Sequence, residues 1–263
     1  SHKLQVDHSP LLLMSLFNRI DSVMIERLLD QGKIEAGIYA QSFRIFDAAS
    51  QFSLLFAALL LPMFSRMLRL KEPVNELLRV ALPLLMVAGL TAALSCNFYK
   101  EEIIDLLYEA HAPYSSRIFG LLMIGFLFVS LSYIYGTLLT ANNNLRQLNI
   151  LAASTVLINV CLNLLLIPRH QALGAAVSSL ISQVYYAMMQ LILSMRLIRI
   201  PLNRDILLRL AGFFALNMVA GYATQWIPGW VTGFVVLLSF CLVSAFWLKL
   251  IRPSEIRAIL KSE

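Results

Sequence analysis

The sequence consists largely of apolar stretches that are each long enough to cross a lipid bilayer. A membrane-spanning helix needs roughly 20 mostly apolar residues. Eight stretches meet this requirement, and Pro, Gly, Asp or Asn residues separate them. They run at about residues 10–29, 36–64, 77–98, 114–141, 145–167, 173–195, 207–226 and 230–250. Because no segment alternates in the way of a membrane β-barrel, we predict an all-α, polytopic membrane helix bundle.

The composition excludes several classes of protein. Only 14% of the residues are charged and 59% are hydrophobic, whereas soluble domains carry about 25% charged residues. This balance argues against a soluble enzyme, a nucleic-acid-binding module or a disordered chain. The three cysteines all lie in apolar runs, which argues against a disulfide framework. The histidines lack metal-ligand spacing and no catalytic set is evident, so we expect neither an enzyme nor a cofactor.

The distribution of basic residues predicts the orientation in the membrane. If the N-terminus is cytoplasmic, 14 of the 21 Lys and Arg residues fall in cytoplasmic segments and 4 fall in outer loops. Cytoplasmic loops of membrane proteins collect Lys and Arg. We therefore expect a multi-pass protein with both termini in the cytoplasm. The chain begins with Ser1 and shows no leader before its first span, which suggests a part of a longer protein.

Four charged residues lie within the first two predicted spans. Arg19 and Asp21 belong to the first, and Arg44 and Asp47 to the second. In an antiparallel hairpin that turns near residue 32, Asp21 is level with Arg44, and Arg19 is level with Asp47. Each lies about 15 Å from the outer end, near the middle of a hydrocarbon core about 30 Å thick. We predict that Asp21 contacts Arg44, directly or through one water, because unpaired burial of charge is costly.

These charges have two interpretations. They either hold the hairpin together as neutralised ion pairs, or form a polar patch that faces a water-filled cavity. The second is favoured because Gln41 and Gln51 share one helical face with Arg44 and Asp47. A second set of polar side chains is interpreted mainly as interhelical packing: Asn159, Asn163, Ser178, Ser182 and Gln183.

Smaller features complete the pattern. Residues 99–109 read as a short interfacial helix on the outer face, and residues 253–260 as a similar helix in the cytoplasm. Pro62 and Pro83 fall inside spans, where we expect them to kink the helices.

Two segments resemble a transporter family. Residues 37–66, GIYAQSFRIFDAASQFSLLFAALLLPMFSR, are similar to the eighth helix of the polysaccharide and oligosaccharide flippases. These belong to the multidrug/oligosaccharidyl-lipid/polysaccharide exporter superfamily. Residues 157–183, LINVCLNLLLIPRHQALGAAVSSLISQ, resemble the paired Asn, Ile-Pro and Gly-Ala-Ala of the same family. Gln171 departs from the Gly that the family commonly has there.

The resemblance implies a domain organisation. Such flippases have fourteen helices in two lobes, and the eight spans here correspond to the seventh to fourteenth. Residues 1–8 would form a cytoplasmic tail and 9–200 a six-helix C-terminal lobe of an alternating-access transporter. Residues 201–263 would supply two additional transmembrane helices and a cytoplasmic tail, with the N-terminal lobe absent from this chain.

The resemblance also implies a function: export of an undecaprenyl-pyrophosphate-linked oligosaccharide across the bacterial inner membrane for surface polysaccharide. Arg44 and then Arg19 would contact the pyrophosphate, since guanidinium binds phosphate oxygens with two donors. Gln41 and Gln51 would lie beside them. Asp21 and Asp47 would serve as counter-ions or bind a coupling proton or sodium ion.

Other partners and functions follow from the same reading. The implied partners are membrane lipid, the missing lobe or a second copy, and glycan-assembly enzymes, but no nucleic acid. Two alternatives remain: a multidrug and toxin cation antiporter of the same fold, and a non-transporting membrane scaffold for glycan assembly.

Overall fold

The computed structural model describes residues 20–108, 112–201 and 203–251, and its regular structure there is entirely helical. A helical segment at residues 20–28 precedes the numbered helices. These are α2 (Gly32–Leu70), α3 (Asn75–Phe98), α4 (Lys100–Leu107), α5 (Ala112–Ala141), α6 (Leu145–Leu197), α7 (Arg204–Thr224) and α8 (Trp230–Trp247). In the described part of the chain, 6 helices are long and apolar enough to cross a membrane. The predicted all-α membrane bundle is therefore confirmed.

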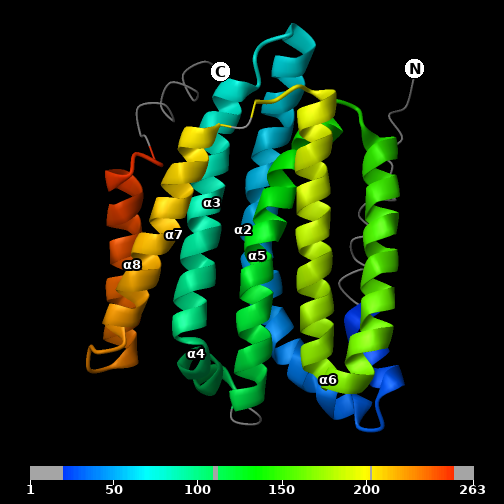
Figure 1. Cartoon of the computed structure of the whole chain (residues 1–263), viewed down its shortest axis with the longest axis vertical. Coiled ribbons are helices and arrows are strands. Elements are labelled where there is room, and N and C mark those ends of the chain that lie inside the picture. The colour runs from blue at the N-terminus through cyan, green and yellow to red at the C-terminus, as the bar shows by residue number, and fades with distance from the viewer. Residues whose placement is uncertain (1–19, 109–111, 202, 252–263) are drawn as a thin grey trace.

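The longest helix, α6, is two antiparallel legs joined at a sharp break (Figure 1). The break lies at Gln171, with φ 54° and ψ −137°. It divides α6 at the place where two separate spans were predicted. Gly174 follows the break, and a Cβ there would lie 2.4 Å from the Leu166 carbonyl oxygen. The absence of a side chain at Gly174 therefore lets the two legs approach closely.

Two side chains hold the start of the second leg. The first N–H groups of a helix have no partner within the helix. Here the Ala172 N–H donates to Glu35 Oε2 at 3.2 Å, and the Leu173 N–H donates to the Tyr114 hydroxyl at 3.2 Å. The Tyr114 hydroxyl in turn donates to the His170 carbonyl. The N-terminal ends of α2 and α5 thus fix the hairpin within α6.

Gln171→Gly is expected to stabilise the chain. A side chain in this backbone region costs on the order of 1–3 kcal/mol, whereas the added freedom of Gly in the unfolded chain costs about 0.5–1 kcal/mol. The exposed Gln171 side chain contributes little burial. We expect a gain of about 1 kcal/mol, or roughly 2–4 °C in melting temperature, measured in detergent. Gln171→Ala is the control, since it keeps the Cβ; an equal gain there would contradict the backbone argument.

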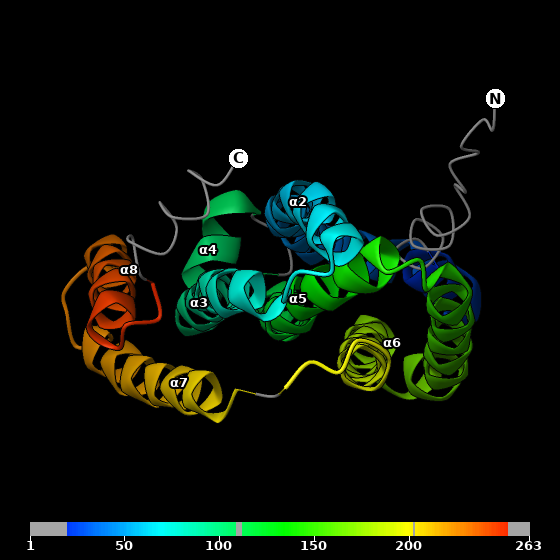
Figure 2. The same cartoon turned by 90° about the horizontal axis from the view of Figure 1, so that it is seen from above.

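Helix α5 forms the centre of the bundle. It packs against α2, α3 and α6, and Figure 2 shows these helices arranged around it. The α7–α8 pair lies to one side and packs on α3. The outer helices expose large apolar side chains, including Leu55, Leu59, Val219 and Trp247. Such exposure in a chain of this composition is the surface expected against lipid.

The two ends of the bundle differ in charge. One end carries the C-terminal ends of α2, α5 and α8, the N-terminal ends of α3 and α7, and both ends of α6 (Figure 1). We call it the basic end; its residues include Arg66, Arg69, Lys71, Arg79, Arg146, Arg196, Arg199, Arg204, Arg209 and Lys249. The predicted interfacial helix is present as α4 and lies at the opposite end. The grouping of basic segments at one end agrees with the predicted topology.

The remaining local predictions concern two prolines and two segments near the ends of the chain. Pro62 and Pro83 lie inside α2 and α3, which continue through them. The predicted helix at 253–260 and the first half of the first span, residues 10–19, fall outside the described residues.

Candidate functional site

The most constrained polar group in the described part of the chain is the carboxylate of Asp21. Its side chain is buried, with 1% exposed. Three neutral donors contact its two oxygens. The Tyr39 hydroxyl donates to Oδ2 at 2.9 Å, the Ser179 hydroxyl to Oδ2 at 2.5 Å, and the Asn163 Nδ2 to Oδ1 at 2.6 Å. These contacts define a built polar site within an apolar bundle.

Four separate segments contribute to this site. Asp21 lies on the first described helical segment, Tyr39 on α2, Asn163 on the first leg of α6 and Ser179 on the second. Asn159, one turn before Asn163, accepts a hydrogen bond from Asn163 Nδ2 at 3.1 Å. We call these five residues the Asp21 cluster. The break at Gln171 is what brings Asn163 and Ser179 to the same depth on facing legs.

Among the described residues, only neutral side chains contact the Asp21 carboxyl group. Hydrogen bonds from neutral donors favour an ionised carboxylate, but burial of an unpaired charge remains costly. Two further buried atoms, Asn163 Oδ1 and Asn159 Nδ2, find no hydrogen-bond partner within the described ranges of the chain. The Asp21 oxygens and Asn163 Oδ1 are hard oxygen ligands, the type that suits a hard cation. The arrangement can therefore bind a small cation or exchange a proton.

The predicted contact between Asp21 and Arg44 is not formed. Asp21 is satisfied by Tyr39, Asn163 and Ser179, and the side chain of Arg44 is exposed on α2. Counting residues from a turn gives depth but not direction around the helix. Tyr39 and Arg44 are five residues apart, which is a rotation of about 140°. Tyr39 therefore points into the bundle, while Arg44 points away from it.

An exposed polar strip runs along α2. Arg44, Asp47 and Gln51 are all exposed, and they share one helical face as the sequence predicts. We call these three residues the α2 polar face. Gln41, predicted on the same face, is half-buried, and its Oε1 accepts a hydrogen bond from the Ser115 hydroxyl of α5 at 2.8 Å. Gln41 thus helps to fasten α2 to α5.

Two other predicted site residues, Asp47 and Arg19, lie outside the Asp21 cluster as described. Asp47 lies within electrostatic reach of Tyr133 on α5, but it is exposed, unlike Asp21. Arg19 falls outside the described residues. Sequence reasoning missed Tyr39 and Ser179 and interpreted Asn159 and Asn163 as packing residues. The available signal was the Asn pair one turn apart, since buried amides in a span need a polar partner.

Comparisons with known proteins agree with this architecture. A family model described as "Lipid II flippase MurJ" matches residues 12–245. Among solved structures, the chain is similar to one titled "Lipid II flippase MurJ, inward closed conformation", with a TM-score of 0.66 and 18% sequence identity. The match covers 96% of this chain and 57% of that one, so this chain spans little more than half its length. No curated protein gives a significant match.

Proposed function

Because the chain belongs to the lipid II flippase MurJ family, we propose that it takes part in moving lipid II, a lipid-linked precursor of peptidoglycan, across the bacterial inner membrane. This is the activity of a transporter and not of an enzyme. The observation that carries the proposal is the family match over residues 12–245. A lipid-linked oligosaccharide for surface polysaccharide, which the motif in residues 37–66 favours, is the second candidate substrate.

The α2 polar face is the proposed contact for the lipid headgroup. A pyrophosphate needs cationic partners, and guanidinium offers two parallel donors to phosphate oxygens. Arg44 supplies such a group, exposed and about 18 Å along α2 from its first residue. Gln51 lies two turns further on the same face. Arg44 also argues against a cationic drug as the substrate, because it would repel one.

The Asp21 cluster is the proposed coupling site. Intramembrane acids in transporters commonly mark ion and proton pathways. Asp21 is buried and surrounded by polar oxygens and donors, whereas Asp47 is exposed. We therefore assign ion coupling to Asp21, with a proton or sodium ion as the coupling cation, and Asn163 Oδ1 as a further ligand.

The domain organisation is part of the same proposal. Residues 9–200 would form one lobe of an alternating-access transporter, and residues 201–263 two peripheral helices with a tail. The α7–α8 pair supports this boundary, since its main contacts with the helices of residues 9–200 are to α3. The opposite wall would come from an N-terminal lobe or from a second copy. The basic end would face the cytoplasm, with both termini on that side.

A flipping assay tests the proposed function. The chain is placed in liposomes with lipid II that carries a fluorescent label, and in parallel with a labelled lipid-linked oligosaccharide that lacks the peptide. We expect binding of lipid II to the chain, and translocation when the second lobe is supplied, because alternating access requires two opposed walls. The readout is protection of the label from a membrane-impermeant quencher.

Three outcomes are informative. Preference for lipid II would support the proposal. Preference for the peptide-free lipid would move the chain to surface polysaccharide export. Binding of neither lipid would overturn the proposed function.

A further inference from the structure

A pocket of about 370 Å³ opens at the basic end, away from the α2 polar face. It lies where the N-terminal ends of α3 and α7 meet the C-terminal end of α6, and Tyr135 of α5 reaches into it. None of its lining residues belongs to α2. A smaller pocket of about 230 Å³ adjoins it and shares Arg79, Asn203, Asp205 and Ile206. The two pockets together form one notched surface beside α7.

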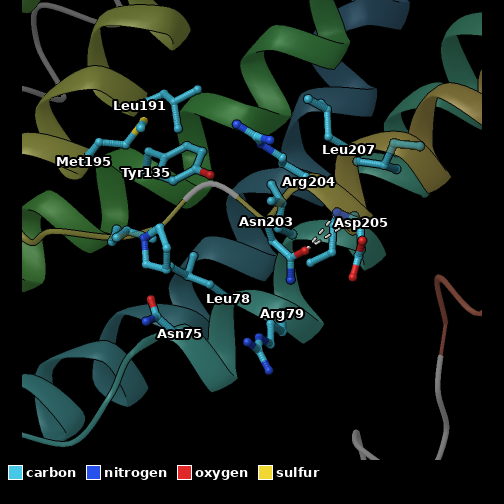
Figure 3. A pocket seen from close by; sticks show the side chains of 15 residues that line it. Asn75, Leu78, Arg79, Tyr135, Leu191, Met195, Asn203, Arg204, Asp205 and Leu207 are labelled. Carbon is cyan, nitrogen blue, oxygen red and sulfur yellow. Dashed lines mark hydrogen bonds between the residues drawn. The ribbon is translucent and has the colours of Figure 1, made fainter.

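The charged part of this surface is mainly cationic. Arg79 of α3 and Arg204 of α7 line the larger pocket and are exposed. Arg209 lines the smaller one and donates to the Leu248 carbonyl oxygen at 3.1 Å, which fastens α7 to the end of α8. Asp205 is the one acid among the lining residues of the two pockets. Figure 3 shows Arg204 with Tyr135 on one side of the α6–α7 connection and Arg79 with Asn75 on the other.

The remaining walls are apolar. Leu191 and Met195 come from the second leg of α6, Leu78 from α3, and Leu207 from α7 (Figure 3). Leu207 is 56% exposed and Met195 is 37% exposed, so an apolar surface remains open beside the arginines. A ligand that fits must therefore carry a negative group and an apolar chain together. A free phosphate would satisfy only the cationic half.

We propose that this pocket binds the headgroup of an anionic phospholipid from the leaflet at the basic end. Arg204 holds the phosphate with two donors, and Arg79, on the other side of the α6–α7 connection, adds to the positive potential of the pocket. An acyl chain lies along Leu191, Met195 and Leu207. Basic pockets between membrane helices suit such headgroups, since each cation near an anionic leaflet adds attraction. The bound lipid fills the space between the end of α6 and the start of α7, and so joins the α7–α8 pair to the central bundle.

Native mass spectrometry of the purified chain with phosphatidylglycerol tests the proposal. We expect the double variant Arg79→Ala/Arg204→Ala to weaken binding of the first lipid by about tenfold or more. The double variant Arg66→Ala/Arg69→Ala is the matched control, because it removes two exposed arginines from the same end outside the pocket. It should bind within about twofold of the wild-type chain, since surface cations without a pocket contribute little. Equal losses in both variants would overturn the site in favour of a general charge effect.

A second measurement does not depend on the folding of these variants. Leu207→Trp places a fluorophore on the apolar wall while both arginines remain. We expect phosphatidylglycerol with brominated acyl chains to quench the added emission more strongly than brominated phosphatidylcholine, after subtraction of the parent chain. Equal quenching by the two lipids would contradict an anionic headgroup site. Inorganic phosphate is added at millimolar concentration as a competitor. If it binds as tightly as the lipid and prevents quenching by brominated phosphatidylglycerol, the pocket is a site for soluble phosphate instead.

Discussion

Asp21→Asn should abolish the response of the purified chain to its coupling cation. A cation that binds the folded chain at a concentration 100 times its Kd stabilises it by about 2.7 kcal/mol. For a chain of this size this corresponds to a rise of about 5–10 °C in melting temperature. The carboxamide keeps the size of the side chain but removes the charge that attracts the cation. We therefore expect the wild-type melting temperature to rise with added sodium or to change with pH, and the variant to show neither response.

The control for this experiment is Asp105→Asn, which removes an exposed acid on α4 and should leave the cation response intact. Asp47→Asn tests which of the two acids proposed from the sequence binds the coupling cation. We expect this variant to retain the change in melting temperature with sodium or pH. Loss of the response in Asp47→Asn with its retention in Asp21→Asn would transfer the coupling role to α2. A wild-type chain that responds to neither sodium nor pH would contradict the coupling proposal as a whole.

The second large effect is expected at Arg44. Hydrogen bonds to charged groups contribute about 1.5–3 kcal/mol each, and a guanidinium makes such bonds to phosphate in pairs. Arg44→Ala should therefore weaken the binding of labelled lipid II by about 10- to 100-fold. Arg44→Lys should recover part of this affinity, because it keeps the charge but loses the paired geometry. The measurement is the Kd for the chain in nanodiscs.

Arg66→Ala is the matched control, since Arg66 is also exposed on α2 but lies near its C-terminal end. It should bind lipid II as the wild-type chain does. Binding by Arg44→Ala within twofold of wild type would remove Arg44 from the headgroup site. The melting temperature of Arg44→Ala should stay close to that of the wild type, because the side chain makes no hydrogen bond to another described residue.

Much of the fold could be predicted because the residues at the ends of each span mark where it begins and ends. Apolar length and the Pro, Gly and Asn punctuation are local properties, and they placed the ends of the helices from α2 to α8 within six residues. The break in α6 was visible as a gap between two spans, although its backbone conformation at Gln171 was not. Even the grouping of basic segments at one end follows from counting along the chain.

The site was harder because it depends on rotation about helix axes. Hairpin counting placed Asp21 level with Arg44, but it could not tell that Tyr39 occupies the inward face of α2 instead. Ser179 was missed for a similar reason: serines bond to helix backbones throughout such bundles, as Ser178 does here with the Gly174 carbonyl. Only the packing of both legs of α6 distinguishes the serine that reaches Asp21 from its neighbour.

The position of Tyr39 has a consequence for energy conversion. Tyr39 binds Asp21, and Arg44 stands about 7.5 Å further along the same rigid helix. With Asp21 as the cation site and Arg44 as the lipid contact, one helix responds to both ligands. Linkage is then reciprocal: any factor by which the cation changes lipid affinity is the factor by which the lipid changes cation affinity. The ion gradient would drive net flipping only to the extent that this factor differs from one. The short stretch of α2 between Tyr39 and Arg44 would then couple cation binding to lipid binding.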